Sequence, residues 1–237
     1  MPDFVHSNPL DINAKSLPPS GLDFAVIDCP GYVEYREGMA LQEQIHARRR
    51  SGDCPDSLVL LEHQPVYTIG RSRDQSSLRD VALLPHPVHE ISRGGKATYH
   101  GPGQLTGYML ADLNHYGRDL HQWLRALERA LALACAEFGV LAGERDGLTG
   151  VWVENRKLAS IGVGVRQWVS MHGFGINLGR ESLRGFQAIT PCGLDGVRMT
   201  CLEHEAGRAI SRADFTAALI PAVHTALGTI RQISGES

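Results

Sequence analysis

The 237-residue sequence has few cysteines, no strong excess of one charge and no long apolar run. Its five cysteines stand far apart and form no C-x-x-C pair, which argues against a disulfide framework and against a four-thiolate zinc site. Because 23 Lys and Arg residues are balanced by 26 Asp and Glu residues, for a net charge of -3, no global positive field attracts nucleic acid or an anionic membrane. We therefore expect a protein of a reducing compartment with neither of these partners.

Targeting and membrane-spanning segments are missing as well. No apolar run approaches the about 20 residues that a membrane-spanning helix needs. The N-terminal residues lack the basic region and the following apolar region of a secretory signal. These absences predict a cytoplasmic protein.

The hydrophobic content, 43%, is sufficient for one substantial core. Residues 1–21 are polar, contain Pro18 and Pro19 and show no hydrophobic period, so we expect a flexible N-terminal arm. No internal repeat, low-complexity segment or shift in composition marks a further boundary. Residues 22–237 are therefore predicted to form a single domain.

Short runs of β-branched, aromatic and other apolar residues between glycines and prolines predict the strands. They occupy residues 24–28, 58–62, 66–69, 88–91, 105–111, 149–154, 157–165 and 171–178. The last three follow one another closely, with a tight turn at Asn155-Arg156, and indicate an antiparallel meander.

Helices are expected between and after these strands. Apolar residues spaced by three and four over residues 120–138 form one stripe and predict the clearest helix, and residues 32–50 predict an earlier one. Two more are expected at residues 200–207 and 211–227, each opened by a Ser or Thr with an acidic residue three positions later. The pattern predicts an α+β single domain with mixed, mostly antiparallel sheets and flanking helices.

The segment from Arg93 to Gln104, RGGKATYHGPGQ, has four glycines and a proline in twelve residues between two predicted strands. Glycines permit positive φ angles and let a ligand approach the main chain, whose N–H groups can then bind an anion or a carbonyl oxygen. A sharp loop that only connects the strands is the alternative. The segment matches neither a Walker A loop nor a G-x-G-x-x-G dinucleotide fingerprint, so it does not indicate a nucleotide-phosphate site.

A second group of glycines lies within two neighbouring predicted strands, at Gly162 and Gly164 and at Gly173 and Gly175. Glycine inside a strand indicates a bulge or the close approach of a ligand or another backbone. A barrel-like bend of the sheet explains the pattern equally well.

Cys192 stands in a loop, between Pro191 and Gly193, whereas Cys135 lies in the apolar stripe of a predicted helix. A buried cysteine is usually inert. A loop cysteine is a credible nucleophile when a nearby cation or hydrogen-bond donor stabilises its thiolate. Cys192 is therefore the candidate nucleophile.

The residues alone leave the partner of that thiol open. Lys157 lies at the predicted meander turn, but most lysines beside turns are solvated. His100 and His172 are rivals, because Cys-His pairs are common among acyl-transferring thiols, although a structural role is more common for a lone histidine.

Metal binding is only weakly indicated. Cys201 and His204 have C-x-x-H spacing, but no second pair follows at ligand spacing. We therefore expect no metal site and assign a structural role to the remaining cysteines, Cys29, Cys54, Cys135 and Cys201.

Three segments in this order and spacing closely resemble one family: RGGKATYHGPGQL, GVWVENRKLASIGVGVRQWVSMHGFGINL and ITPCGL. It is the octanoyl-acyl-carrier-protein:protein octanoyltransferase family of lipoate biosynthesis, commonly called LipB, in the biotin/lipoate protein ligase superfamily. The resemblance covers residues 24–205, and the three motifs are highly specific together although each glycine loop alone is weak. Leu194 and the long N-terminal arm are the variable features.

The resemblance implies a biotin/lipoate protein ligase-like fold and a two-step acyl transfer without a cofactor. The family's motif cysteine, here Cys192, takes the octanoyl group from octanoyl-acyl carrier protein, and its motif lysine, here Lys157, is the partner of the thiol. The acyl-enzyme then acylates a lysine on a lipoyl domain, in E2 subunits of 2-oxoacid dehydrogenases or in the glycine cleavage H protein.

The same resemblance implies an acyl pocket whose backbone N–H groups are the expected oxyanion hole. Its expected lining is Arg93, Gly94, Gly95, Lys96, Ala97, Thr98, Tyr99, His100, Ser160, Ile161, Gly162, Gly173, Phe174 and Gly175. Both macromolecular substrates resemble small acidic domains, so we expect Arg71 and Arg73 to help dock the carrier.

Three alternatives remain at this point. An ATP-dependent lipoate or biotin ligase of the same superfamily has a related glycine-rich loop but makes an acyl-adenylate, and its activity requires ATP and magnesium. A non-catalytic acyl-carrier-binding module would keep its function in Cys192→Ala. A thiol hydrolase would release free acid in place of an amide. The loop position of Cys192 and the modest chain length favour the transferase.

Overall fold

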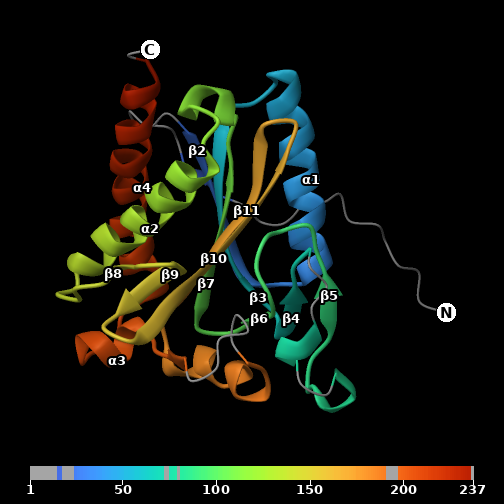
Figure 1. The fold of residues 1–237 in the computed structure, drawn as a ribbon, viewed down its shortest axis with the longest axis vertical. Helices are drawn as coiled ribbons and strands as arrows, with labels where there is room; N and C mark the ends of the chain where they lie inside the picture. Colours follow the sequence, from blue (N-terminus) through green and yellow to red (C-terminus); the bar gives the residue numbers. More distant parts are fainter. Residues whose placement is uncertain (1–14, 18–23, 72–74, 79–80, 191–196, 236–237) are drawn as a thin grey trace.

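The computed structural model describes residues 15–17, 24–71, 75–78, 81–190 and 197–235, which form a large and a small β-sheet (Figure 1). The large sheet has nine strands. Eight follow the order β1 (Lys15–Leu17), β2 (Phe24–Val33), β3 (Asp56–His63), β7 (Gln104–Leu110), β11 (Val169–Asn177), β10 (Arg156–Arg166), β9 (Leu148–Val153) and β8 (Gly143–Arg145), and β12 (Arg198–Met199) pairs with β10. The small sheet has the order β5 (Val88–Glu90), β4 (Val66–Ile69) and β6 (Thr98–His100).

Most neighbouring strands run antiparallel, and the fold confirms the predicted α+β class. β2 and β3 are parallel and are joined by helix α1 (Tyr35–Ser51), as a parallel connection requires. The β9–β10–β11 meander is antiparallel as predicted. Its first turn lies one residue earlier than predicted, because Arg156 already pairs with Val153, and Glu154 takes up the positive φ of 53°.

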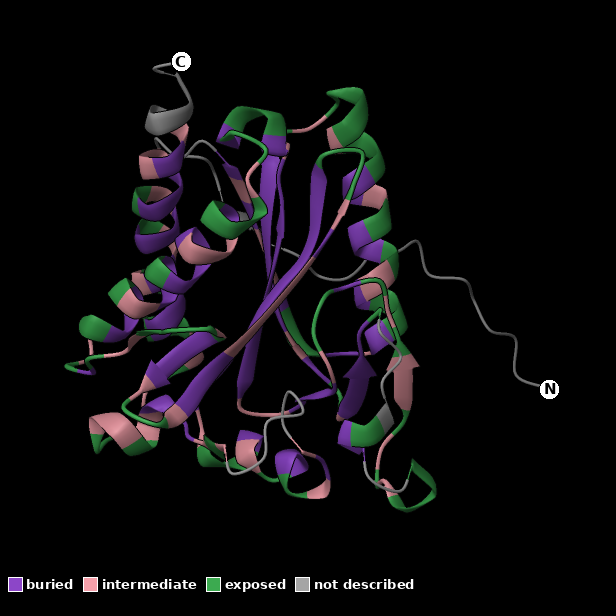
Figure 2. Cartoon of the chain, in the orientation of Figure 1, coloured by how far each residue is buried: buried purple, intermediate pink, exposed green. Residues whose placement is uncertain are grey.

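Helices and the small sheet cover the two faces of the large sheet (Figure 1). α2 (Leu120–Ala136) and α4 (Arg212–Gly235) pack together on one face, and α1 and the small sheet lie on the other. In β3, Leu58 and Leu60 join the core of the α2 and α4 side, whereas Val59 and Leu61 join the core beneath α1. β3 is thus buried on both faces, which explains its continuous apolar run (Figure 2).

The predicted helix 32–50 begins later, at Tyr35, because Tyr32 and Val33 belong to β2. Glu34 is its N-cap, and the carboxylate of Glu34 accepts hydrogen bonds from the backbone N–H groups of Arg36 and Glu37. The predicted helix 120–138 is α2, which ends two residues earlier than the apolar stripe.

The two C-terminal helices differ in how well their starts were predicted. α3 (Leu202–Ala206) forms, but the predicted capping box is wrong: Cys201 is the N-cap without a side-chain bond, and the Thr200 hydroxyl donates to Glu205. α4 begins as predicted, since the Ser211 hydroxyl and the Asp214 carboxylate and backbone N–H bond reciprocally.

By length and composition alone, α4 from Arg212 to Arg231 could cross a membrane. Its apolar residues, such as Phe215, Leu219 and Val223, instead pack into the main core together with α2. A buried core helix explains this composition.

Short elements connect the sheets. They are the 3₁₀ turns η2 (Gln75–Leu78), η3 (Val81–Leu83), η4 (Leu113–Tyr116), η5 (Arg180–Leu183) and η6 (Gly185–Ala188). Within the predicted N-terminal arm, β1 pairs antiparallel with β2, while residues 1–14 and 18–21 lie outside the described residues.

Candidate active site

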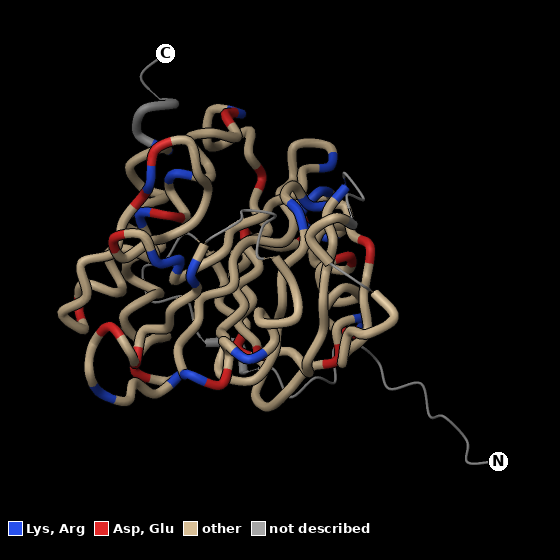
Figure 3. The backbone as a smooth tube through the Cα atoms, turned by 60° about the horizontal axis from the view of Figure 1, so that its bottom comes forward, with Lys and Arg blue, Asp and Glu red and all other residues tan. Residues whose placement is uncertain are grey.

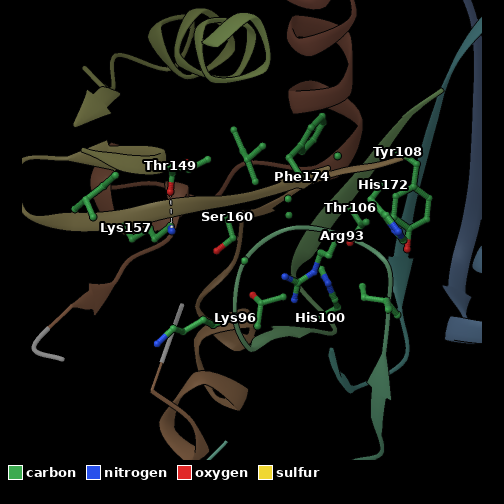
Figure 4. Close-up of a pocket in the computed structure, with 18 of the residues that line it drawn as sticks. Arg93, Lys96, His100, Thr106, Tyr108, Thr149, Lys157, Ser160, His172 and Phe174 are labelled. Atoms are coloured by element: carbon green, nitrogen blue, oxygen red, sulfur yellow. Dashed lines mark hydrogen bonds between the residues drawn. The ribbon is translucent and has the colours of Figure 1, made fainter. Parts of the chain in front are cut away.

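A pocket of about 210 Å³ lies between the two sheets (Figure 4). Its floor is formed by β7, β11 and β10 of the large sheet, and its roof by β6 and the loop that precedes it. Tyr35 at the start of α1 closes one side, and Thr149 at the start of β9 lies on another.

Glycines leave the floor open. Three strands, β10, β11 and β7, pair side by side here. Gly162 of β10 pairs with Gly173 of β11, which pairs with Tyr108 of β7. Two residues along, Ser160 pairs with Gly175, which pairs with Thr106. A Cβ atom on Gly162 would lie 2.9 Å from Arg93 Cδ, so the roof loop approaches the strand there as only glycine permits. The glycine-rich loop and the glycine-broken strands are therefore two walls of one pocket. A bend of the sheet alone does not explain why these glycines lie opposite each other.

Lys157 lies at one end of this pocket (Figure 4). Its side chain is only 2% exposed, its Nζ donates to the Thr149 carbonyl oxygen at 2.9 Å, and Nζ lies 5.2 Å from the centroid of the Trp152 ring. The alternative that Lys157 is solvated, as most lysines beside turns are, is therefore wrong. Gly150, with φ +127°, makes the room, because a Cβ atom there would lie 2.6 Å from Lys157 Cε.

Cys192 lies outside the described residues, but both flanks of its segment are held in place. On one side, Thr190 N–H donates to the Ser77 carbonyl oxygen at 2.8 Å. On the other, Met199 of β12 is the register partner of Lys157.

His100 lies toward the other end of the pocket (Figure 4), and its tautomer is determined by Gln104. The Gln104 amide nitrogen donates to Tyr99 O and Asn177 Oδ1, so Gln104 Oε1 accepts, and His100 Nδ1 donates to it at 2.7 Å. Burial first, and then the nearby His63, lower the pKa of His100 to about 3. His100 is therefore neutral at pH 7, with a lone pair on Nε2.

Tyr108 has an equally defined orientation. His63 Nδ1 donates to the Val33 carbonyl oxygen at 3.0 Å, so His63 Nε2 accepts the Tyr108 hydroxyl proton. Burial lowers the pKa of His63 to about 4, which keeps this imidazole neutral. The Tyr108 oxygen retains acceptor capacity toward the pocket that it lines.

His172 is the third neutral histidine near the pocket. Burial, followed by the charge of Arg93, lowers the pKa of His172 to about 4. Arg93 is itself buried, and its guanidinium donates to Thr68 O, Thr68 Oγ1 and Gly94 O at 2.8 to 3.0 Å. Since His100 and His172 are neutral and lie away from Lys157, neither supplies a cation for a thiolate at the Lys157 end (Figure 4).

Most of the predicted pocket residues line this pocket. They are Arg93, Gly95, Lys96, Thr98, His100, Ser160, Ile161, Gly162, Gly173, Phe174 and Gly175. Ala97 and Tyr99 pack instead in the apolar cluster of the small sheet, because side chains alternate along β6. Gly94 does not line the pocket, and its N–H donates to Val163 O at 3.0 Å.

The backbone donors expected to form an oxyanion hole are partly occupied. Besides the Gly94 N–H, the Ala97 N–H is engaged, since it donates to Ser77 Oγ at 3.1 Å. These two N–H groups are therefore not available to a carbonyl oxygen.

Sequence reasoning did not place eight lining residues in the pocket: Tyr35, Ile91, Thr106, Tyr108, Gly147, Leu148, Thr149 and His172. His172 was considered only as a partner of the thiol. For Thr106 and Tyr108, polar groups at alternate positions of a buried strand were the available signal.

The four described cysteines are poor nucleophiles. Burial raises the pKa of Cys29 to about 11 and that of Cys135 to about 12, and it also raises the pKa values of Cys54 and Cys201. All four thiols are therefore protonated at pH 7. Within the described ranges, no cluster of three or more His, Cys, Asp or Glu residues could hold a metal ion.

Charges of both signs are mixed over the surface (Figure 3). Arg71 is exposed beside the roof loop, where its Nη2 donates to Ser92 O at 3.2 Å. Arg73 lies outside the described residues, so the predicted pair of docking arginines stays a prediction.

Comparison with known proteins relates the chain to one family. The model of the lipoyl protein ligase A/B catalytic domain matches residues 34–224. An octanoyltransferase of Geobacter sulfurreducens is 51% identical over 79% of this chain and 78% of its own length, and one of Geobacter metallireducens is 47% identical over 78% and 84%.

Solved structures share the fold at low sequence identity. A crystal structure of lipoate-protein ligase A bound with ATP superposes with a TM-score of 0.68 at 18% identity, covering 83% of this chain and 84% of the other. A bi-partite lipoate protein ligase from Thermoplasma acidophilum gives 0.67 at 17% identity, over 83% and 82%.

Proposed function

The chain belongs to the lipoyl protein ligase A/B catalytic-domain family and, within it, to the octanoyltransferases; it is therefore an acyltransferase, and we propose the route of the transfer. The octanoyl group passes from octanoyl-acyl carrier protein to Cys192 and then to a lysine of a lipoyl domain. The acceptor domains are those of 2-oxoacid dehydrogenase E2 subunits and of the glycine cleavage H protein.

One observation carries this proposal: a buried lysine lies at one end of the pocket, beside the strand that follows Cys192 in the chain. Lys157 is held by Thr149 O, and Met199 pairs with it in the sheet. The described cysteines have raised pKa values, so Cys192 is the thiol that we assign as nucleophile.

In the first half-reaction, Cys192 Sγ attacks the thioester carbonyl carbon of the carrier. Lys157 accepts the thiol proton, and its ammonium stabilises the thiolate. A bond forms between Sγ and the acyl carbon, the bond to the carrier's sulfur breaks, and the released sulfur takes the proton back.

In the second half-reaction, the neutral ε-amine of the acceptor lysine attacks the acyl carbon on Cys192. The new C–N bond replaces the C–S bond, and Lys157 accepts the proton that the attacking nitrogen loses. Lys157 passes this proton to the departing Cys192 thiolate, which regenerates the thiol, and no ATP or metal ion enters the balance. We assign the glycine floor and Phe174 to the acyl chain, whose burial contributes about 0.8 kcal/mol per CH₂.

Mass spectrometry of the intact protein and its peptides tests the route. The enzyme is mixed with octanoyl-acyl carrier protein, without ATP and without an acceptor, and we expect an octanoyl adduct on the Cys192 peptide. The matched control is Cys54→Ser, at a half-buried cysteine, and we expect this variant to keep the octanoyl adduct. We expect Cys192→Ser to lose the adduct.

Other outcomes identify the alternatives. Modification of a lipoyl domain only with ATP and free octanoate would place the chain among the ligases. Free octanoic acid as the main product would indicate a hydrolase, and unchanged carrier-dependent function in Cys192→Ala would indicate a binding module.

A further inference from the structure

Two buried hydroxyl groups in the pocket have no role in binding a hydrocarbon chain. Thr106 on β7 is 1% exposed and Thr98 on β6 is 5% exposed, and both line the pocket. Neither Oγ1 atom finds a hydrogen-bond partner among the described residues. Valine has the same shape as threonine, so these hydroxyls point to a polar ligand atom in the pocket.

Thr106 lies at the end distal to Lys157. Along β10, Ser160 is three residues from Lys157, which is about 10 Å. Across the sheet, Ser160 faces Gly175 and Gly175 faces Thr106, so two strand spacings add about 10 Å in the perpendicular direction. Figure 4 accordingly shows Thr106 with Tyr108, His172 and His100, away from Lys157.

The neighbouring groups at this end are hydrogen-bond acceptors. His100 Nδ1 is committed to Gln104, so Nε2 presents a lone pair. The Tyr108 hydroxyl donates to His63, so its oxygen accepts from the pocket side. A group that donates one hydrogen bond to such an acceptor and accepts one from Thr106 is therefore complementary to the site.

We propose that this end of the pocket is a subsite for a hydroxyl group at the far end of the acyl chain, and that the enzyme also transfers ω-hydroxylated medium-chain acyl groups. The inference rests on the proposed function, which places the acyl carbonyl at the Lys157 end. The bonds made and broken are those of octanoyl transfer. The distal hydroxyl keeps its proton and is not consumed.

Competition between octanoyl-acyl carrier protein and 8-hydroxyoctanoyl-acyl carrier protein tests the subsite. The readout is the ratio of the two kcat/KM values for loading of Cys192. An apolar pocket end disfavours an added hydroxyl by about 100-fold. We expect the wild-type ratio to lie within about threefold of unity.

Variants of Thr106 separate the hydroxyl from the shape of the side chain. Thr106→Val should lower the ratio of hydroxylated to plain substrate by about tenfold or more, and Thr106→Ser should restore it. Thr98→Val is a second variant in case Thr106→Val does not fold. A wild-type ratio near 1:100, or a ratio unchanged in both valine variants, overturns the proposal.

Failure of the proposed function gives a different result. If neither carrier thioester loads Cys192, the route is wrong, and calorimetry with octanoic and 8-hydroxyoctanoic acid then tests the subsite directly. Tighter binding of the hydroxy acid, lost in Thr106→Val, supports the subsite without catalysis. Equal or weaker binding of the hydroxy acid overturns it.

Discussion

At the Lys157 end of the pocket, a buried amine lies against a carbonyl oxygen and an indole ring, beside the strand that leads to Cys192. At the Thr106 end, His63 fixes the orientation of Tyr108 and Gln104 fixes that of His100, and Thr106 itself has no partner among the described residues. The first end holds the candidate group for proton transfer. The second presents directed hydrogen-bond acceptors without a titration near pH 7.

Under the proposed function, this difference separates the reaction from the recognition of the chain end within one pocket. A group that exchanges protons must lie next to the reacting atoms, whereas recognition of a chain end requires groups that do not change charge. Burial serves the second purpose, because it lowers the pKa values of His63, His100 and His172 far below neutrality.

Removing the amine at the reactive end should have the largest effect. Lys157→Ala is expected to reduce octanoyl transfer at least about 100-fold, because it deletes the proposed proton acceptor. Lys96→Ala, at a second lysine on the pocket wall, is the matched control and should lose less than about tenfold. Steady-state rates measure both, and circular dichroism checks the folds. Near wild-type activity in Lys157→Ala would transfer its role to another group.

A substitution at Gly150, whose backbone lies against the Lys157 side chain, should have nearly as large an effect. Gly150→Ala introduces a Cβ atom 2.6 Å from both Ala159 O and Lys157 Cε, at φ +127°. We expect a loss of about 2–4 kcal/mol in the free energy of unfolding together with reduced transfer. Gly147→Ala has a φ of +72° but open space, so it should lose only about 1 kcal/mol. Urea unfolding measures both, and equal losses would show that the close approach to Lys157 does not matter.

The neutral histidines at the Thr106 end should make the free energy of unfolding depend on pH. A histidine whose pKa is lowered in the folded state binds more protons when unfolded, so the free energy of unfolding falls as pH drops below 6.5. The decline continues toward pH 4, at up to about 1.4 kcal/mol per pH unit for each of His63, His100 and His172.

One substitution isolates this contribution. Asparagine tolerates the positive φ of 61° at position 172, and His172→Asn removes one titrating ring. The slope of the free energy of unfolding against pH should therefore become smaller between about pH 6.5 and 4.5. Denaturant titrations at several pH values measure it. A slope unchanged by His172→Asn would mean that this ring does not titrate on unfolding.

The smallest effect is expected for Arg71, which is exposed beside the roof loop and lies at neither end of the pocket. Arg71→Glu should raise the KM for the acidic carrier roughly threefold at low salt, with the difference disappearing at high salt. Arg129→Glu, at an exposed position of α2 on the opposite face of the sheet, is the charge-matched control. An unchanged KM in Arg71→Glu at low salt would remove this arginine from the docking surface.

Local patterns were sufficient to predict much of the fold. The α2 stripe, the meander and the Ser211-Asp214 cap depend on neighbours a few residues away, and each was predicted close to its place. The starts of α1 and α3 were wrong, because β2 continues through Val33 and the Thr200 hydroxyl binds Glu205. The role of Cys192 stays a prediction, since its segment lies outside the described residues.

The sequence by itself identified candidate residues for the chemistry, because glycine density and a loop cysteine are properties of short segments and Lys157 lies in a motif of the family. Tertiary structure decided which of them meet. Gly162, Gly173 and Tyr108 become neighbours only through pairing of β10, β11 and β7, and Lys157 becomes buried only because Gly150 leaves room for it. The protonation states of His100 and His172 likewise follow from burial, which is a property of the packed chain.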